Sequence, residues 1–143
     1  MEEKDIYDIL NIILERIKGK DFLWRLEGSA NLKLQGMELS VKDLDIITSS
    51  EGVEVFREAL KEYIEKDFYD DKLKAHSLVC NINGFEVEIN CEDDKMLEMF
   101  DKVKNIDWRG LSIPTLPLEN AKEFYRIVGK QEKVDLIEKY LKK

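Results

Sequence analysis

The stretch HSLVCNINGFEVEINC at residues 76–91 constrains the fold of this chain more than any other feature. Asn83-Gly84 stands between two runs of alternating apolar and polar residues, and an Asn-Gly pair in that position favours a two-residue hairpin turn. Side chains alternate between the two faces of a strand, so one face of this hairpin is apolar and the other carries Glu86 and Glu88. The hairpin therefore predicts a sheet with one face on a hydrophobic core and with carboxylates on the opposite face.

Helical and strand periodicity predicts further elements on both sides of this hairpin. Helices are expected over 4–18, 29–36, 51–66, 95–104, 118–128 and 131–142, and extended segments over 22–28, 41–48 and 111–117. This order is typical of an α/β (α+β) fold with a small mixed β-sheet, helices packed on one face, and C-terminal helices. We expect a single domain over 1–143, with a core over about 1–92 and a C-terminal helical part over about 93–143.

Composition restricts the class of protein and its partners. The 143 residues are 43% hydrophobic and 38% charged, which is typical of an ordered globular protein. No apolar run approaches the roughly 20 residues that cross a bilayer, and the stretch MEEKDIYDIL lacks the positive region of a signal peptide, so we expect a cytoplasmic protein without membrane association. The formal charge of −8 disfavours long nucleic acid but affects a small nucleotide carrying Mg²⁺ much less. Abundant Lys and Glu favour a thermophilic source.

The cysteine and histidine content excludes several kinds of site. Cys80 and Cys91 are too few for a disulfide scaffold, and the expected turn places Cys80 opposite Val87, so we expect two buried thiols. His76 is the only histidine, so the chain cannot assemble a cluster of histidines around a metal or a Ser-His-Asp triad.

Asp43 and Asp45 point to the same side of the expected strand 41–48. If this strand neighbours the hairpin, up to four carboxylates converge on one open face, those of Asp43, Asp45, Glu86 and Glu88. Like charges so placed repel unless a cation lies between them, and Mg²⁺ prefers carboxylate oxygens. Each acidic pair taken alone also fits a purely structural role, as the solvated face of an edge strand or as a charged hairpin edge.

Gly28-Ser29 lies where the expected strand 22–28 meets the expected helix 29–36. Glycine lets the backbone approach a phosphate closely, and a helix start presents unpaired N–H groups, although the pair alone also fits a simple helix cap. A phosphate cradle beside a carboxylate cluster is what phosphoryl transfer requires. Lys130 and Lys133, near the start of the last helix, fit an exposed helix face better than a contact with a triphosphate.

Together these residues carry a resemblance. Gly28-Ser29, a spacer of thirteen residues, Asp43-Leu44-Asp45 and a third acid on a later strand resemble the DNA polymerase β-like nucleotidyltransferase superfamily. Nearly the whole chain resembles the small stand-alone prokaryotic proteins of this superfamily, in which a stretch like LPLE (116–119) precedes the last helices. Lys42 stands where the superfamily usually has an apolar residue, and the third acid is a glutamate where aspartate is commoner.

The resemblance implies an enzyme that transfers a nucleoside monophosphate from an NTP, with ATP the expected donor, to an acceptor hydroxyl and releases pyrophosphate. It implies that Asp43, Asp45 and Glu88 are catalytic and hold two Mg²⁺ ions, for which Mn²⁺ can substitute. Gly28 and Ser29 would bind the nucleotide phosphates, and the acceptor would be a small molecule or a protein. The alternative is a non-catalytic or regulatory module, such as the antitoxin half of a toxin–antitoxin pair with a helical toxin-like partner.

The third acid is Glu88 or Glu86, and the expected hairpin register favours Glu88. Glu88 falls opposite Val79, whereas Glu86 falls opposite Asn81, next to the turn. Positions nearer the strand centre hold a metal ligand more rigidly. We therefore predict that Glu88 faces Asp43 and Asp45 within reach of one ion and that Glu86 points outward.

Overall fold

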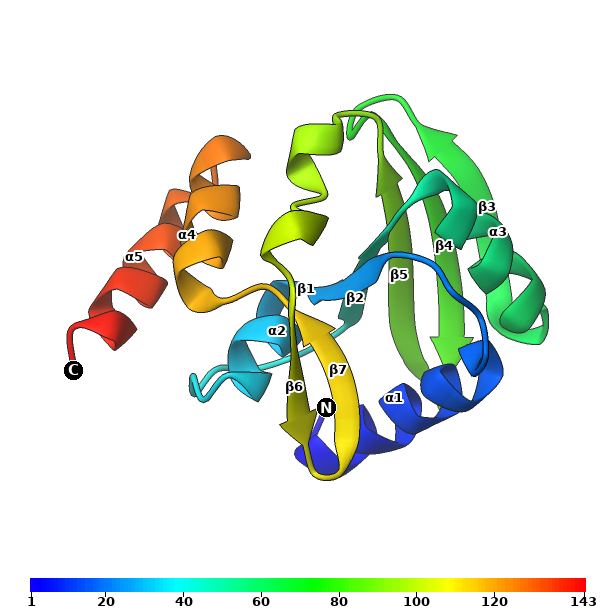
Figure 1. The fold of residues 1–143 in the computed structure, drawn as a ribbon, viewed down its shortest axis with the longest axis horizontal. Coiled ribbons are helices and arrows are strands. Elements are labelled where there is room, and N and C mark those ends of the chain that lie inside the picture. Colours follow the sequence, from blue (N-terminus) through cyan, green and yellow to red (C-terminus); the bar gives the residue numbers. More distant parts are fainter.

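A central sheet of five strands organises the structure, a computed structural model that describes residues 1–143 (Figure 1). The spatial order is β1-β2-β5-β4-β3, in which β2 and β5 run parallel and every other neighbouring pair runs antiparallel. Two further strands, β6 and β7, form a separate antiparallel ribbon. The bounds are β1 Trp24–Glu27, β2 Leu44–Thr48, β3 Ile64–Asp70, β4 Ala75–Ile82, β5 Phe85–Glu92, β6 Lys104–Trp108 and β7 Leu111–Thr115.

Two helices, α1 (Glu3–Ile17) and α3 (Ser50–Ala59), cover one face of this sheet. Helix α1 presents an apolar stripe at helical spacing, and its side chains pack on alternate residues of the strands, such as Ile46 and Ile89. Helix α3 begins at an N-cap, where the Ser49 hydroxyl accepts a hydrogen bond from the Gly52 N–H at 3.0 Å. This face holds the main hydrophobic core.

A second, smaller core lies on the other side of β1 and β2. It joins α2 (Gly28–Leu34), α4 (Leu118–Ile127) and α5 (Gln131–Leu141) to Ile47 of β2 and to Leu116. Helices α4 and α5 form an antiparallel pair at the edge of the molecule, beside α2 (Figure 1). The helices therefore lie on both sides of the sheet: α1 and α3 on one, as predicted, and the C-terminal pair on the other.

The hairpin prediction is confirmed residue by residue. Strands β4 and β5 meet at Asn83-Gly84, Cys80 lies opposite Val87, and both cysteines are buried free thiols. Apart from the helices expected over 51–66 and 95–104, the other boundaries agree within a few residues, and residues 111–115 are extended as expected.

One expected helix is too long and another is absent. The helix over 51–66 ends at Ala59, and after a single 3₁₀ turn (Lys61–Tyr63) the chain continues as edge strand β3. The apolar spacing of Tyr63 and Ile64 fits a helix, but pairing of Ile64 with Cys80 on β4 decides the conformation.

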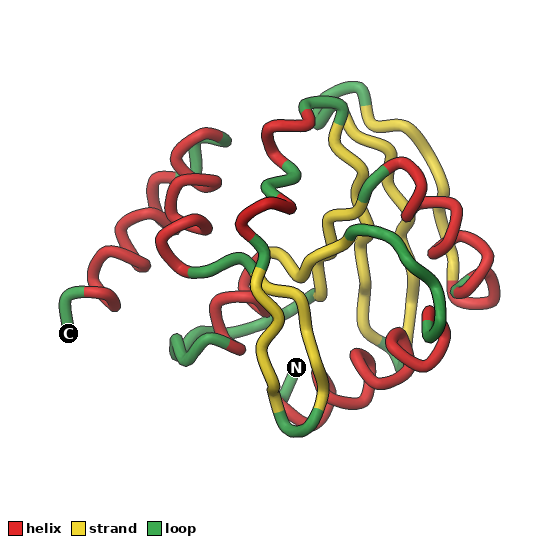
Figure 2. Tube along the Cα trace, viewed as in Figure 1, coloured by secondary structure: helices red, strands yellow, loops and turns green.

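The helix expected over 95–104 is replaced by two 3₁₀ turns (Lys95–Leu97 and Phe100–Lys102) and then by strand β6 (Figure 2). Met99 between the two turns has φ of 51°, a left-handed conformation that no α-helix can contain. The part of the chain expected to be helical from about residue 93 therefore starts with turns and a ribbon, and becomes helical only at Leu118. No helix is long and apolar enough to cross a membrane.

Candidate active site

Three carboxylates stand in a row across neighbouring strands on the face opposite α1 and α3. Asp45 of β2 is paired with Glu88 of β5 on one side and with Glu27 of β1 on the other. Neighbouring strands lie about 4.8 Å apart, which brings these side chains into one patch. The expected adjacency of Asp45 and Glu88 is thus present, and Glu27 is an additional acid that the sequence reasoning missed.

Asp45 is the electrostatic centre of this patch. Burial, followed by the charges of Glu88, Glu27 and Asp43, raises the pKa of its carboxyl from 3.8 to about 7, and Lys130 opposes the shift. A half-buried acid with such a pKa beside a hollow is typical of a functional site. None of Asp43, Asp45, Glu86 and Glu88 forms a salt bridge.

The two candidate third acids differ in burial. Glu88 lies opposite Val79 and is half-buried, whereas Glu86 lies opposite Asn81 near the turn and is exposed. The predicted hairpin register is therefore confirmed. Desolvation raises the pKa of Glu86, and the charges of Asp43 and Glu88 add to the shift.

A hollow of about 290 Å³ lies beside Asp45 and is lined by Ser29, Ser40, Lys42, Asp43 and Asp45. Asp43 immediately precedes β2 and is exposed. The structure thus brings the Gly-Ser turn and both aspartates to one place. Its side chains do not place three His, Cys, Asp or Glu residues close enough together to hold an ion, so the set Asp43, Asp45 and Glu88 stays a prediction.

The donor chemistry nevertheless fits Mg²⁺. All the candidate ligands are carboxylate oxygens, which this ion prefers. Asp45 is half-buried among other acids without a basic partner in contact, and such an arrangement is stabilised by a cation.

Gly28 and Ser29 connect β1 to α2 against the Asp45 side chain. Gly28 has φ of +72°, and a Cβ atom at this position would lie 2.6 Å from Asp45 Oδ2. Only glycine allows this backbone conformation and this close approach together. The Gly28 backbone therefore borders the carboxylate directly.

The Ser29 hydroxyl accepts a hydrogen bond from Lys133 Nζ at 2.8 Å. Lys133 lies in the first turn of α5 and is half-buried, so its assignment to an exposed helix face is wrong, whereas Lys130 is exposed as expected. Helical periodicity alone could not reveal the contact, because it depends on where α5 packs against α2.

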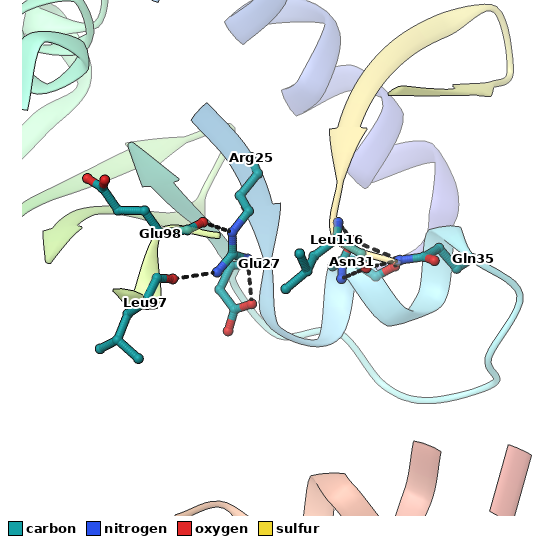
Figure 3. A network of polar contacts seen from close by, with 7 residues as sticks. All are labelled: Arg25, Glu27, Asn31, Gln35, Leu97, Glu98 and Leu116. Atoms are coloured by element: carbon teal, nitrogen blue, oxygen red, sulfur yellow. Dashed lines mark hydrogen bonds and ion pairs between the residues drawn. The ribbon is translucent and has the colours of Figure 1, made fainter. Parts of the chain in front are cut away.

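Buried Arg25 holds Glu27 in place and anchors the segment between β5 and β6 (Figure 3). Its guanidinium donates to the carbonyls of Glu98 at 2.8 Å and Leu97 at 3.1 Å, and to Glu27 Oε1 at 3.1 Å. Its guanidinium carbon also lies 5.0 Å from the ring centroid of Phe124 on α4. One side chain thus connects the acidic face to the C-terminal helices.

A second polar network ties α2 to the start of α4 (Figure 3). The buried Asn31 amide donates to the Leu116 carbonyl at 3.0 Å and accepts from the Leu116 N–H at 3.2 Å, and Gln35 donates to the same carbonyl at 2.7 Å. Because Asn31 is two residues after Ser29, these bonds fix the C-terminal helices relative to the Gly28-Ser29 turn.

Tyr125 of α4 lies near Glu27 and Asp45 of the acidic patch. Its side chain is buried and its hydroxyl has no hydrogen-bond partner. Burial raises the pKa of this phenol, and the charges of Glu27 and Asp45 raise it further.

A family model for aminoglycoside-2''-adenylyltransferases matches residues 9–140 of the chain. The chain belongs to this family. A protein from Thermotoga maritima assigned to the nucleotidyltransferases has the same architecture, with a TM-score of 0.79, 26% identity, and coverage of 99% of this chain and 96% of that one. No protein in a search of curated sequences matches.

Two antibiotic-modifying enzymes share the fold. The lincosamide antibiotic adenylyltransferase LnuA, solved with lincomycin, has a TM-score of 0.64 at 15% identity, covering 96% of this chain and 97% of that one. ANT(2'')-Ia, solved with adenylyl-2''-tobramycin, has a TM-score of 0.65 at 9% identity, covering 96% and 90%. The predicted nucleotidyltransferase fold is confirmed.

Proposed function

We propose that this member of the family transfers AMP from ATP to a hydroxyl group of a small molecule and releases pyrophosphate. The observation that carries the proposal is the position of Asp45, half-buried between Glu27 and Glu88 and directly against Gly28. Membership of an adenylyltransferase family supports ATP as the donor.

We assign Mg²⁺ binding to Asp43, Asp45 and Glu88. When bound, the metal neutralises charge on the phosphates and lowers the pKa of the attacking hydroxyl. The chain itself contributes a rigid carboxylate on β2, because the main-chain ladders to β1 and β5 fix Asp45 on both sides.

The remaining roles follow from position. Ser29 lines the hollow beside Asp45 and the Gly28 backbone lies against the Asp45 carboxylate, which suits binding of the β- and γ-phosphates. Glu88 is the residue paired with Asp45 on the neighbouring strand β5, where its carboxylate can complete the metal site or accept the proton of the acceptor hydroxyl.

The acceptor is expected to carry positive charge. Glu86 and Glu92 share the open face with Glu88, and the pKa of each is raised by desolvation and by neighbouring carboxylates. This excess of acids beyond the proposed metal ligands favours an amine-bearing small molecule over an anionic one. No specific observation favours the regulatory alternative with a helical protein partner.

Calorimetric titration with ATP, with and without Mg²⁺, tests the proposal. The unmodified protein should bind ATP only with Mg²⁺, and Asp45→Asn and Asp43→Asn should each weaken that binding by at least about tenfold, because each removes a charged ligand. Asp71→Asn is the matched control, since Asp71 is exposed in the turn between β3 and β4. Equal affinity in all four proteins would contradict the assignment of the two aspartates.

A further inference from the structure

Half-buried Lys133 brings its ammonium group to the Gly28-Ser29 end of the candidate site. Its only hydrogen bond goes to the hydroxyl of Ser29, which lines the hollow beside Asp45. The two residues are 104 positions apart in the chain, so the contact depends on the packing of α5 against α2.

This ammonium group forms one hydrogen bond and no salt bridge. An ammonium has three N–H donors, and Lys133 forms no salt bridge with any carboxylate. Two donors therefore remain for a ligand. A partly desolvated cation that contacts only a neutral hydroxyl attracts an anion.

The position of Lys133 is rigid rather than incidental. The next residue, Val134, is buried in the smaller core together with Ile137, so both core-facing positions of α5 are fixed. The bonds between Asn31 and Leu116 hold α2 and the start of α4 together. Exposed Lys130 adds a second positive charge near Asp45.

We propose that Lys133 binds the triphosphate of the nucleotide together with Ser29, so that helix α5 supplies part of the nucleotide site. This inference rests on the proposed function, because it concerns the same nucleotide. It makes the C-terminal helices a working part of the site and Lys133 a nucleotide-binding residue in addition to Gly28 and Ser29.

The test uses the full chain with three variants and Mg²⁺·ATP as the probe. Lys133→Gln keeps a polar group that can bond Ser29 but removes the charge, Lys133→Arg keeps the charge, and Lys139→Gln changes an exposed lysine on the same helix. We expect Lys133→Gln to raise the Kd for ATP by at least about tenfold, because charge-assisted hydrogen bonds to phosphate are roughly twice as strong as neutral ones. Lys133→Arg should stay within a few-fold of the unmodified protein, and Lys139→Gln should match it.

The unfolding temperature without nucleotide separates a phosphate contact from a structural bond. The inference predicts that Lys133→Gln unfolds at the same temperature as the unmodified protein. Unchanged ATP affinity in Lys133→Gln would overturn it, as would a parallel fall in affinity and unfolding temperature that Lys133→Arg fails to rescue. If the unmodified protein binds no ATP with Mg²⁺, the proposed function fails as well; if Asp45→Asn loses binding and Lys133→Gln retains it, only this inference fails.

Discussion

The two faces of the five-stranded sheet are built from alternate residues of the same strands, yet they have opposite effects on the stability of the fold. On the face covered by α1 and α3, Ile46 and Ile89 are fully buried in the main core. One position away, Asp45 and Glu88 crowd together on the other face. Burial of the first pair stabilises the fold, and desolvation and repulsion of the second pair destabilise it.

This contrast teaches that the site is held rigid by residues that never face it. Each acid is fixed by apolar neighbours in sequence, which anchor the strand from behind. Stability and chemistry can therefore be separated by substitutions one residue apart, and each prediction below breaks or sharpens that separation.

The largest expected effect comes from substituting neighbours on β2. Ile46→Ala should lower the free energy of unfolding by about 2–5 kcal/mol through the cavity it leaves, while the folded fraction keeps its activity. Asp45→Asn should lower Mg²⁺-dependent transfer by at least about 10³-fold without lowering stability. Urea unfolding and pyrophosphate release check both, and a destabilised Asp45→Asn protein would contradict the contrast.

Stability should depend on pH through the acidic face. The pKa of Asp45 is raised from 3.8 to about 7, so the folded state binds this proton more tightly than the unfolded state does. The stabilising contribution is complete below the unfolded pKa and is lost as pH rises through about 7. Relative to Asp45→Asn, the unmodified protein should lose up to about 4 kcal/mol between about pH 4 and pH 8.

Urea unfolding at several pH values in the presence of a chelator measures this difference, because other titrating groups cancel between the two proteins. Added Mg²⁺ should restore stability to the unmodified protein at high pH if Asp45 holds the ion. A difference that does not change with pH would mean that Asp45 is not strained by its surroundings.

The two glutamates of β5 sharpen the comparison within the acidic face. Glu88→Gln should abolish Mg²⁺-dependent activity, a loss of at least about 10²-fold, because Glu88 lies directly across from Asp45. Glu86→Gln should leave most of the activity, because Glu86 is exposed near the turn. Steady-state kinetics with a panel of amine-bearing acceptors measures both, and the reverse order would identify Glu86 as the third acid.

The smallest expected effect concerns Tyr125 of α4 and the free energy of unfolding. Tyr125→Phe removes a buried hydroxyl that has no partner, so the free energy of unfolding should stay the same or rise by about 1 kcal/mol. Thermal unfolding checks this value. A clear loss of stability would mean that the hydroxyl is bonded in solution.

The sequence predicted features that depend on local chemistry. The Asn83-Gly84 turn set the hairpin register, which correctly placed Glu88 opposite Val79. The Gly28-Ser29 pair and the two aspartates were singled out by their spacing, and Ser29, Asp43 and Asp45 line one hollow.

The features that were missed depend on contacts between distant segments. Strand β3 forms because Ile64 pairs with Cys80, and Lys133 reaches Ser29 because α5 packs beside α2. Glu27 precedes the Gly-Ser pair in the sequence and could have been noticed, but only the antiparallel pairing of β1 with β2 places it beside Asp45.

Arg25 fixes the segment between β5 and β6 by its main chain, through the carbonyls of Leu97 and Glu98. Every amino acid offers the same carbonyl, so the side chains of this segment can be exchanged during evolution while its path over the sheet is kept. A cavity of about 420 Å³ lies beside this segment. It is lined by Ile127 of α4 and by seven residues of the segment: Lys95, Met96, Glu98, Met99, Phe100, Asp101 and Lys102. This anchor therefore lets the side chains that line the cavity vary without a matching change in the sheet.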